Sequence, residues 1–507
     1  MTAEGSGMKR LLRTMLITGA AFVINYMITL VLTPFITSTV GTAAYGFVSL
    51  AKSVAQYATI ITLALNSFAA RHIAVAYHNG DMKRANVFFS STFYGDVVLG
   101  GLVMAVAVGC ILFLEKIFVI PPELVGDVKL LFLIVFINFL LVTVFTVFGA
   151  GAHIANRLDV VGVFKLLSYA AEALLLVVIY RFLKPRVAYV GLGLLAAGSV
   201  VVASNVWITR RYTPQLGVKR GDFSRDAVKK LVGDGIWSSL NDLGVLLHNG
   251  LDLAICNLML TPLAMGQLAI AKSIDLIFHS LYQVVAQAFQ PMLLRSYAEN
   301  KMDKLLQELK LSMKLSGMLA NLAFAGFFAL GMAYYKLWIP GEDIALVYRL
   351  TVITVMTSVA SGCMKPLYYI YTLTVKQKVP CVVTIVTGVM NVVGMFLLIR
   401  YTNLGIDAVV WTTVVLVGFI NFVSNPLYMA HVLHQPLSTF YPQILRNVLS
   451  CAIITVLFTG LSRLYMPENW LGLILCVAVY AAIGGVVHLA VVFAPSEWRM
   501  VLKRLKK

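Results

Sequence analysis

Stretches of about 20 apolar residues recur along the whole chain, and this recurrence limits the possible folds more than any other feature. A helix needs about that length to cross the ~30 Å hydrocarbon layer of a bilayer. Backbone groups that face lipid must bond within their own helix or in a closed barrel. The sequence therefore predicts an all-α polytopic membrane protein with about 14 transmembrane helices. The expected spans are residues 11–37, 44–72, 87–114, 124–149, 158–180, 185–209, 231–260, 263–293, 311–337, 345–374, 377–400, 404–432, 443–466 and 469–494.

Composition agrees with this class and excludes soluble ones. Of the 507 residues, 60% are hydrophobic and 12% are charged, and the mean hydropathy is +0.87, far above soluble domains. The formal net charge of +18 does not indicate nucleic acid as a partner, because such proteins gather basic residues on a folded soluble face. The six cysteines lie in apolar stretches without a CxxC pair, so neither disulfides nor a metal site is predicted.

Lys and Arg residues gather in alternate connections between the expected spans. If the N-terminus is cytoplasmic, about 27 of the 40 Lys and Arg lie on the cytoplasmic side and roughly nine lie outside. Because cytoplasmic loops carry the excess of positive charge in membrane proteins, we expect both termini to be cytoplasmic.

The connections between spans exclude several functions. The longest holds only about 20 residues, whereas an independent soluble domain needs about 50. The chain contains no GxxxxGK[ST] sequence, and therefore no P-loop for ATP hydrolysis. The eight histidines lack the spacing of metal ligands. We therefore expect no enzymatic activity, no catalytic residue, no cofactor and no bound metal.

An internal repeat relates two parts of the chain at an offset of 220 residues. Gly46 matches Gly266, and the Ala-Lys-Ser sequence around Lys52 matches the one around Lys272. Six spans separate the copies, so both have the same orientation, as in parallel repeats that hold substrate between them. The repeat predicts two six-helix lobes around a central cavity, plus two extra C-terminal helices. The expected domains are an N-terminal lobe at residues 1–215, a C-terminal lobe at residues 216–436, and a helix pair with a basic tail at residues 437–507.

Polar residues in four of the expected spans fall on narrow faces. In span 263–293 the polar side chains lie within an arc of roughly 120°. Similar faces occur in spans 11–37, 44–72 and 231–260. Polar groups that face lipid would lack hydrogen-bond partners, so these faces must turn toward protein or a water-filled cavity. The candidate binding residues are Lys52, Gln56, Asn66, Asn241, Asn249, Lys272, His279, Gln283 and Gln287, and the candidate coupling-ion residues are Asp242, Asp252 and Asp275.

Structural interpretations of the same residues stay open. The two lysines could extend toward the membrane interface or form ion pairs, and Asp275 lies three residues after Lys272 on the same face. Span 44–72 itself offers Lys52 only Gln56 as a polar neighbour. Lys365, next to Pro366, is interpreted as part of a kink, and Glu172 is interpreted as serving helix contacts.

The stretch GTAAYGFVSLAKSVAQYATIITLALNSFAARHIA, at residues 41–74, resembles the polysaccharide transport family of the multidrug/oligosaccharidyl-lipid/polysaccharide flippase superfamily. The Trp237, Asn241 and Asp252 pattern fits the same family of O-antigen and exopolysaccharide repeat-unit flippases. The resemblance implies a V-shaped cavity between the lobes, alternating access, and a polyprenyl-pyrophosphate-linked oligosaccharide as cargo. It also implies a protein of a bacterial or archaeal cytoplasmic membrane that works as a monomer, with other polysaccharide assembly proteins as further partners.

The chemistry of such a cargo agrees with the polar faces. A pyrophosphate cannot cross hydrocarbon without compensating charge, and Lys52 and Lys272 offer one cation from each lobe. The amide side chains suit sugar hydroxyls. Three alternatives remain: a lipid II flippase, which also has 14 helices; a cation-coupled multidrug extruder, which typically has 12; and a scaffold that transports nothing.

Overall fold

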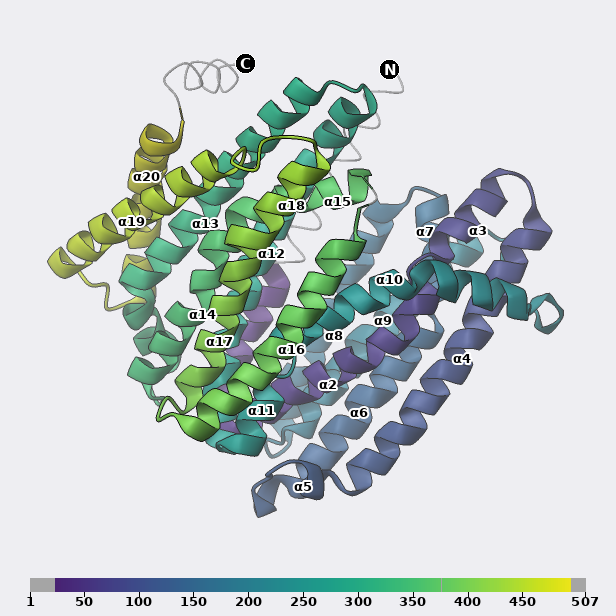
Figure 1. Ribbon diagram of the computed structural model, residues 1–507. Coiled ribbons are helices and arrows are strands. Elements are labelled where there is room, and N and C mark those ends of the chain that lie inside the picture. The colour runs from purple at the N-terminus through teal and green to yellow at the C-terminus, as the bar shows by residue number, and fades with distance from the viewer. Residues whose placement is uncertain (1–22, 375, 494–507) are drawn as a thin grey trace. The chain divides into compact units, whose positions relative to one another are not determined.

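A computed structural model describes residues 23–374 and 376–493, and every regular element in these ranges is a helix (Figure 1). In chain order the helices are Val23–Thr39, α2 (Thr42–Asn66), α3 (Ala69–His78), α4 (Met82–Leu112), α5 (Leu114–Ile117), η1 (Pro122–Leu124), α6 (Val125–Val144), η2 (Thr146–Gly149), α7 (Ala150–Ile154), α8 (Leu158–Phe182), α9 (Ala188–Tyr212), η3 (Arg220–Asp222), α10 (Arg225–Asn249), α11 (Asp252–Met259), α12 (Pro262–Ala298), α13 (Met302–Trp338), α14 (Ile344–Met364), η4 (Lys365–Tyr368), α15 (Tyr369–Thr374), α16 (Lys378–Tyr401), α17 (Ile406–Phe419), η5 (Ile420–Ser424), α18 (Asn425–Val432), α19 (Tyr441–Leu464) and α20 (Trp470–Val492).

The predicted fold class is confirmed. Within the described ranges, 12 helical segments are long and apolar enough to cross a membrane. The shorter apolar helix Val23–Thr39 and the α10–α11 segment lie where the other two spans are expected. Residues 11–22 of the first expected span lie outside the described residues. Charged residues, among them Lys229 and Lys230, occupy the first turns of α10.

Several expected spans are interrupted helices. The α14 segment passes through the 3₁₀ turn η4 at Lys365–Tyr368, where Pro366 removes a backbone N–H. The α17 segment passes through the π-helical η5 before Pro426. Helices α10 and α11 are separated at Gly250 and Leu251. These breaks free backbone carbonyls within the membrane, and such groups need partners from neighbouring helices.

Polar side chains cap the N-termini of several helices. The Asp81 carboxylate accepts from Arg84 N–H at 3.0 Å at the start of α4, and Asp343 accepts from Leu346 N–H at 3.0 Å at the start of α14. Asn469 caps α20 through Gly472 N–H at 2.8 Å. Each cap satisfies a donor that the helix leaves open, and is worth about 1 kcal/mol.

The chain forms two compact units, one made of residues 1–246 and 250–266 and the other of residues 247–249 and 267–507. This division follows contacts, whereas the division into lobes at residues 215 and 436 follows the repeat and stays a prediction. Helices α10 and α11 fall mostly in the first unit, and α19 and α20 belong to the second.

In the first unit, α4, α6 and α9 pack side by side, with α8 against α9 and α3 against α4. Its apolar core joins α2, α3 and α4 with α10 through Leu65, Ile73, Phe89 and Leu231, all fully buried. Backbones approach closely where side chains are absent. A Cβ on Gly46 would lie 2.9 Å from the Cα of Gly266, so the two glycines matched by the repeat touch each other.

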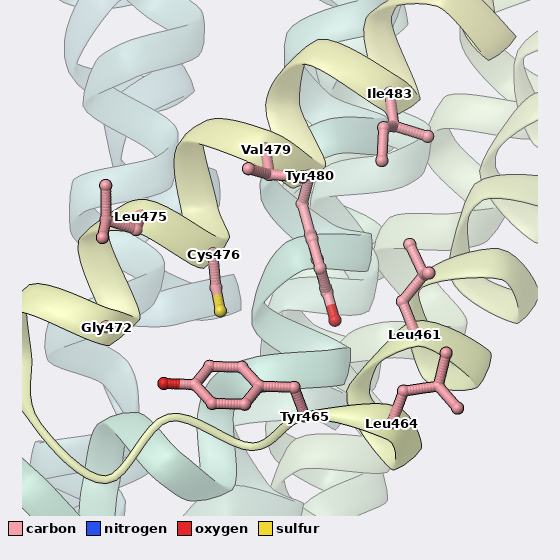
Figure 2. Close-up of a pocket in the computed structure, with 9 residues that line it drawn as sticks. All are labelled: Leu461, Leu464, Tyr465, Gly472, Leu475, Cys476, Val479, Tyr480 and Ile483. Atoms are coloured by element: carbon pink, nitrogen blue, oxygen red, sulfur yellow. The ribbon is translucent and has the colours of Figure 1, made fainter.

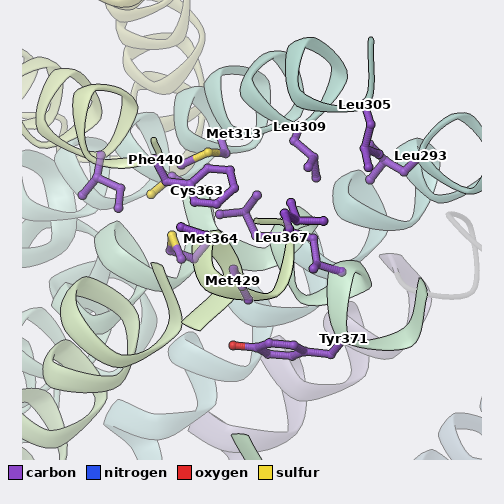
Figure 3. Close-up of a cluster of buried hydrophobic side chains, with 14 residues drawn as sticks. Leu293, Leu305, Leu309, Met313, Cys363, Met364, Leu367, Tyr371, Met429 and Phe440 are labelled. Carbon is purple, nitrogen blue, oxygen red and sulfur yellow. The ribbon is translucent and has the colours of Figure 1, made fainter. Parts of the chain in front are cut away.

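In the second unit, α13 is the central helix and packs against α14, α19 and α20. Figure 3 shows one core, where Leu309 and Met313 of α13 meet Met364 and Leu367 of the α14 segment. The C-terminal pair is held to α13 by apolar contacts and by buried polar ones. Asn321 of α13 donates to the Asn447 carbonyl of α19 at 2.8 Å, and His488 Nε2 of α20 lies 3.1 Å from the Lys314 carbonyl of α13.

Candidate functional site

In the first unit, Lys52 stands on the exposed side of α2, while Phe47, Leu50 and Ala51 fill the core on its other side. Gln56, one turn further on, is also exposed. The charge of Lys52 acts on Glu172 of α8, a carboxylate with only 6% exposure. Lys52 therefore has an acidic neighbour that its own helix does not supply.

Asn66, at the end of α2, is half-buried and turned toward α4. Its side-chain amide donates to Asp96 Oδ1 at 2.7 Å and to the Thr62 carbonyl at 3.1 Å. Asp96 is fully buried. The sequence analysis did not select Asp96 as a candidate. The signal was present, because Asp96 is the single carboxylate in the apolar run of span 87–114, and a charge inside a membrane is energetically costly.

The break between α10 and α11 holds a second polar group of the first unit. Asp252, at the first position of α11, is 4% exposed and lies close enough to Tyr57 for their charges to interact. The Tyr57 hydroxyl donates to the Gly250 carbonyl that the break frees. Asn241 and Asp242 are exposed on α10. The side chain of Asn249 lies outside the described part of the chain.

In the second unit, four ionisable groups gather around α12. Asp275 is 9% exposed, and the Nε2 of His279 lies 3.8 Å from its Oδ1. Lys272 is half-buried one turn before. Lys365 reaches the same group from η4, near enough for its charge to interact with Asp275 and His279. With neutral histidine, two lysines and one carboxylate leave this cluster with a net positive charge.

Lys365 is therefore more than part of a kink. The turn at Pro366 brings it to the α12 cluster, and its Nζ also lies 5.8 Å from the Tyr368 ring centroid, a cation–π distance. Gln283 and Gln287 continue the same face of α12 as exposed amides. We call Lys272, Asp275, His279 and Lys365 the α12 charge cluster.

A polar network also surrounds His248 in the second unit. Its Nε2 lies 2.9 Å from the Thr387 hydroxyl, and its carbonyl accepts from Asn391 at 2.8 Å. These contacts bind the end of α10 to α16. In the described part of the chain, no group of three or more His, Cys, Asp or Glu side chains is arranged to hold a metal.

An apolar groove runs between α19 and α20 (Figure 2). It has a volume of about 460 Å³ and is lined on one side by Leu461, Leu464 and Tyr465 and on the other by Val479 and Ile483. Figure 2 shows Cys476 and Tyr480 extending from α20 toward the space between the two helices, with the Tyr465 ring facing Cys476. Its lining suits a hydrocarbon chain and offers nothing for a sugar or a charged group.

Comparison with protein families decides the family of this chain. Residues 11–297 match the family described as polysaccharide biosynthesis protein. The chain belongs to that family. The match includes the whole stretch at residues 41–74 on which the resemblance was based, and the resemblance is confirmed.

This polysaccharide biosynthesis protein also matches proteins along most of its length. It is 27% identical over 487 residues to the uncharacterized membrane protein EpsK of Bacillus subtilis (strain 168), covering 96% of each chain. Its fold is similar to the inward-facing conformation of a multidrug resistance MATE family transporter of the MOP superfamily, with 18% identity, a TM-score of 0.62, and coverage of 83% of this chain and 98% of that one. It is also similar to the lipid II flippase MurJ in an inward closed conformation, with 12% identity, a TM-score of 0.59, and coverage of 91% and 99%. The chain is thus a multi-pass membrane protein with the fold of these transporters.

Proposed function

We propose that this polysaccharide biosynthesis protein is a flippase for a lipid-linked oligosaccharide. It moves a polyprenyl-pyrophosphate-linked oligosaccharide from the inner to the outer leaflet of a bacterial or archaeal cytoplasmic membrane by alternating access. No bond is made or broken in this step. The family match and the transporter fold support the membrane and polysaccharide parts of the proposal.

The α12 charge cluster is the observation that carries the proposal. Two lysines within membrane-spanning segments are expensive to maintain and indicate a functional site. Together with the single carboxylate of Asp275 they give the four-residue cluster a net positive formal charge, which suits an anionic ligand. A pyrophosphate has negative charge and several acceptor oxygens, and charge-assisted hydrogen bonds to it are the strong kind.

Other groups suit the sugar and lipid parts of the cargo. Gln283 and Gln287 on α12, and Gln56 on α2, are exposed amides that can donate to and accept from sugar hydroxyls. The apolar groove between α19 and α20 suits the prenyl chain, which gains nothing from leaving hydrocarbon. Lys52, Asn66, Asn241 and Asn249 remain candidates for the same cargo from the repeat and the polar faces.

Orientation and assembly are part of the proposal. The excess of Lys and Arg on one side supports cytoplasmic termini. The repeat predicts two lobes in one chain, residues 1–215 and 216–436, and parallel repeats of this kind can form a substrate site within one chain, which supports a functional monomer. Other polysaccharide assembly proteins receive the cargo on the outer side.

A combined Lys52→Gln and Lys272→Gln variant tests this function in cells. We expect loss of surface polysaccharide and accumulation of lipid-linked repeat units on the cytoplasmic leaflet. Lys336→Gln, at an exposed end of α13, is the matched control and should export normally. Normal export by a stably inserted double variant would contradict the proposal.

The same cells separate the two transport alternatives, both of which have relatives with this fold. Accumulation of lipid II with unchanged surface polysaccharide would identify a lipid II flippase. Hypersensitivity to small amphipathic compounds, again with unchanged polysaccharide, would identify a multidrug extruder. In the latter case Asp252→Asn or Asp275→Asn should reproduce the sensitivity.

A further inference from the structure

Asp96 is a buried carboxyl group that the proposed cargo does not use. It lies 14 residues after the first residue of α4 and 16 before the last, or about 21 Å and 24 Å along the helix. This position is near the middle of a membrane-spanning segment. The side chain is fully buried, and its one described hydrogen bond is the 2.7 Å contact from the Asn66 amide to Oδ1.

Apolar side chains surround Asp96 along α4. A Cβ on Gly95 would meet Leu65 of α2, and a Cβ on Gly100, one turn after Asp96, would meet Leu140 of α6. One turn before Asp96, the Phe93 ring lies 5.9 Å from the Phe145 ring. The site has little water access, so an ionised carboxylate there would lose its hydration without replacement.

No cation compensates Asp96 within the described part of the chain. The titratable and charged residues on the elements packed against α4 are Tyr45, Lys52 and Tyr57 of α2, Arg71, His72, Tyr77 and His78 of α3, Glu115 and Lys116 of α5, Asp127 and Lys129 of α6, and Arg220 and Asp222 of η3. Asp127 is paired with Arg186, Lys129 with Glu115, and His72 with Asp234. Of all described side chains, only the neutral Asn66 acts electrostatically on Asp96.

Two unsatisfied oxygens complete the pattern. Asp96 Oδ2 and Asn66 Oδ1 are both buried and have no hydrogen-bond partner. They belong to the same two side chains that already share one hydrogen bond. While Asp96 is ionised both oxygens are acceptors, and neither can satisfy the other. A proton on Oδ2 turns that atom into a donor for Asn66 Oδ1, and both orphaned groups are then satisfied.

We propose that Asp96 and Asn66 form a buried proton-binding site, in which a proton bound to Asp96 Oδ2 is donated as a hydrogen bond to Asn66 Oδ1. The proton comes from a hydronium ion in water: one O–H bond of hydronium breaks and leaves water, one O–H bond to Asp96 Oδ2 forms, and no group is oxidised or reduced. A hard cation such as Ca²⁺ or Mg²⁺ takes about six oxygen ligands, and only two unpartnered oxygens gather here.

The site links protonation to helix packing. With the proton bound, Asp96 is neutral and α2 and α4 stay packed. Once the proton leaves, the charged carboxylate favours any conformation that admits water between these helices. Asn66 stands on the same helix as Lys52, so opening at Asp96 is transmitted to the cargo-facing side of α2 through one rigid element. This site does not depend on the identity of the cargo.

Infrared spectroscopy of the purified full-length protein in lipid vesicles tests the site. We expect a protonated carboxyl C=O band at neutral pH that is lost in Asp96→Asn and retained in Glu172→Gln, the matched control for another buried acid of the same unit. Asn66→Leu should keep the band but shift it to higher frequency, because a hydrogen bond to the carbonyl is lost. A band unchanged in Asp96→Asn would overturn the proposal.

Stability provides a second measurement. The new amide of Asp96→Asn can form the same pair of hydrogen bonds with Asn66 as the protonated acid, so this variant should fold with a wild-type melting temperature at pH 7. If Asp96 is instead ionised and held by an unseen cation, the substitution removes that ion pair. A variant that fails to fold would then contradict the proposal as clearly as an unchanged band.

Discussion

At the residue scale, charge placement within apolar helices carries most of the functional information. The charge of Lys365 acts on Asp275, that of Lys272 acts on the neighbouring His279, and that of Lys52 acts on Glu172. In both units, a lysine on a membrane-spanning helix has one buried carboxylate near it. The two units differ because the second contributes an additional lysine, and we therefore expect the α12 charge cluster to bind an anion more strongly than Lys52 does.

We expect Lys365→Gln to weaken binding of a polyprenyl-pyrophosphate lipid at least about tenfold, since a hydrogen bond to a charged group is worth about 1.5–3 kcal/mol. The measurement is a titration of the purified protein in lipid nanodiscs. Lys336→Gln is the control and should bind as the wild type does. Equal affinity for Lys365→Gln would show that η4 only shapes the helix.

Glu172→Gln should have the opposite effect. Removal of this buried carboxylate leaves the Lys52 cation without its acidic neighbour, and binding of the anionic lipid in the same titration should strengthen by a few fold. Lys52→Gln should weaken it. Weaker binding in Glu172→Gln would contradict the placement of Lys52 on the cargo path and would indicate an ion pair that only supports the fold.

At the element scale, small residues decide which helices can cross closely. Gly317 of α13 lies against the side-chain amide of Asn447 of α19, which is fully buried. A Cβ at this position would overlap that amide. Gly326, on the same helix, has no atom within 4 Å of an added Cβ. The two glycines therefore form a matched pair within one element.

Gly317→Ala should destabilise the docking of α19 on α13 by about 1–3 kcal/mol, the usual cost of overpacking. Gly326→Ala should be neutral or slightly stabilising, because alanine favours the helix by about 1 kcal/mol. Thermal unfolding in detergent measures both. If the two variants melt at the same temperature, α13 and α19 do not cross as closely as described.

The sequence predicted the features that depend on local signals or on the internal repeat, and it did not predict those that depend on how the helices pack. Lengths of apolar runs and the 220-residue offset predicted the helices and the lysine pair, because these signals are local or exact repeats. The neighbours Glu172, Lys365 and Asp96 could not be paired with Lys52, Asp275 and Asn66, because helix packing brings them together. The interruption at Gly250 also depends on packing, whereas Pro366 in η4 and Pro426 after η5 mark their breaks in the sequence.

At the scale of the whole molecule, the polysaccharide biosynthesis family, the transporter fold and the intramembrane charges agree with one activity. In the function we propose, the cluster with net positive charge holds the anionic linkage, the exposed amides bind the sugars, and the apolar groove suits the lipid chain. Each unit is built around its own buried polar groups, and alternating access requires two such bodies that move as units.

Transbilayer movement of the cargo is the central claim. Purified protein is reconstituted in liposomes that carry a lipid-linked oligosaccharide on the inner leaflet, and a membrane-impermeant enzyme that modifies the sugar reports its arrival outside. We expect the wild type and Lys336→Gln to expose the cargo, and a variant with both Lys272→Gln and Lys365→Gln to lose nearly all of this movement. Equal exposure by the double variant, or none by the wild type, would contradict the account.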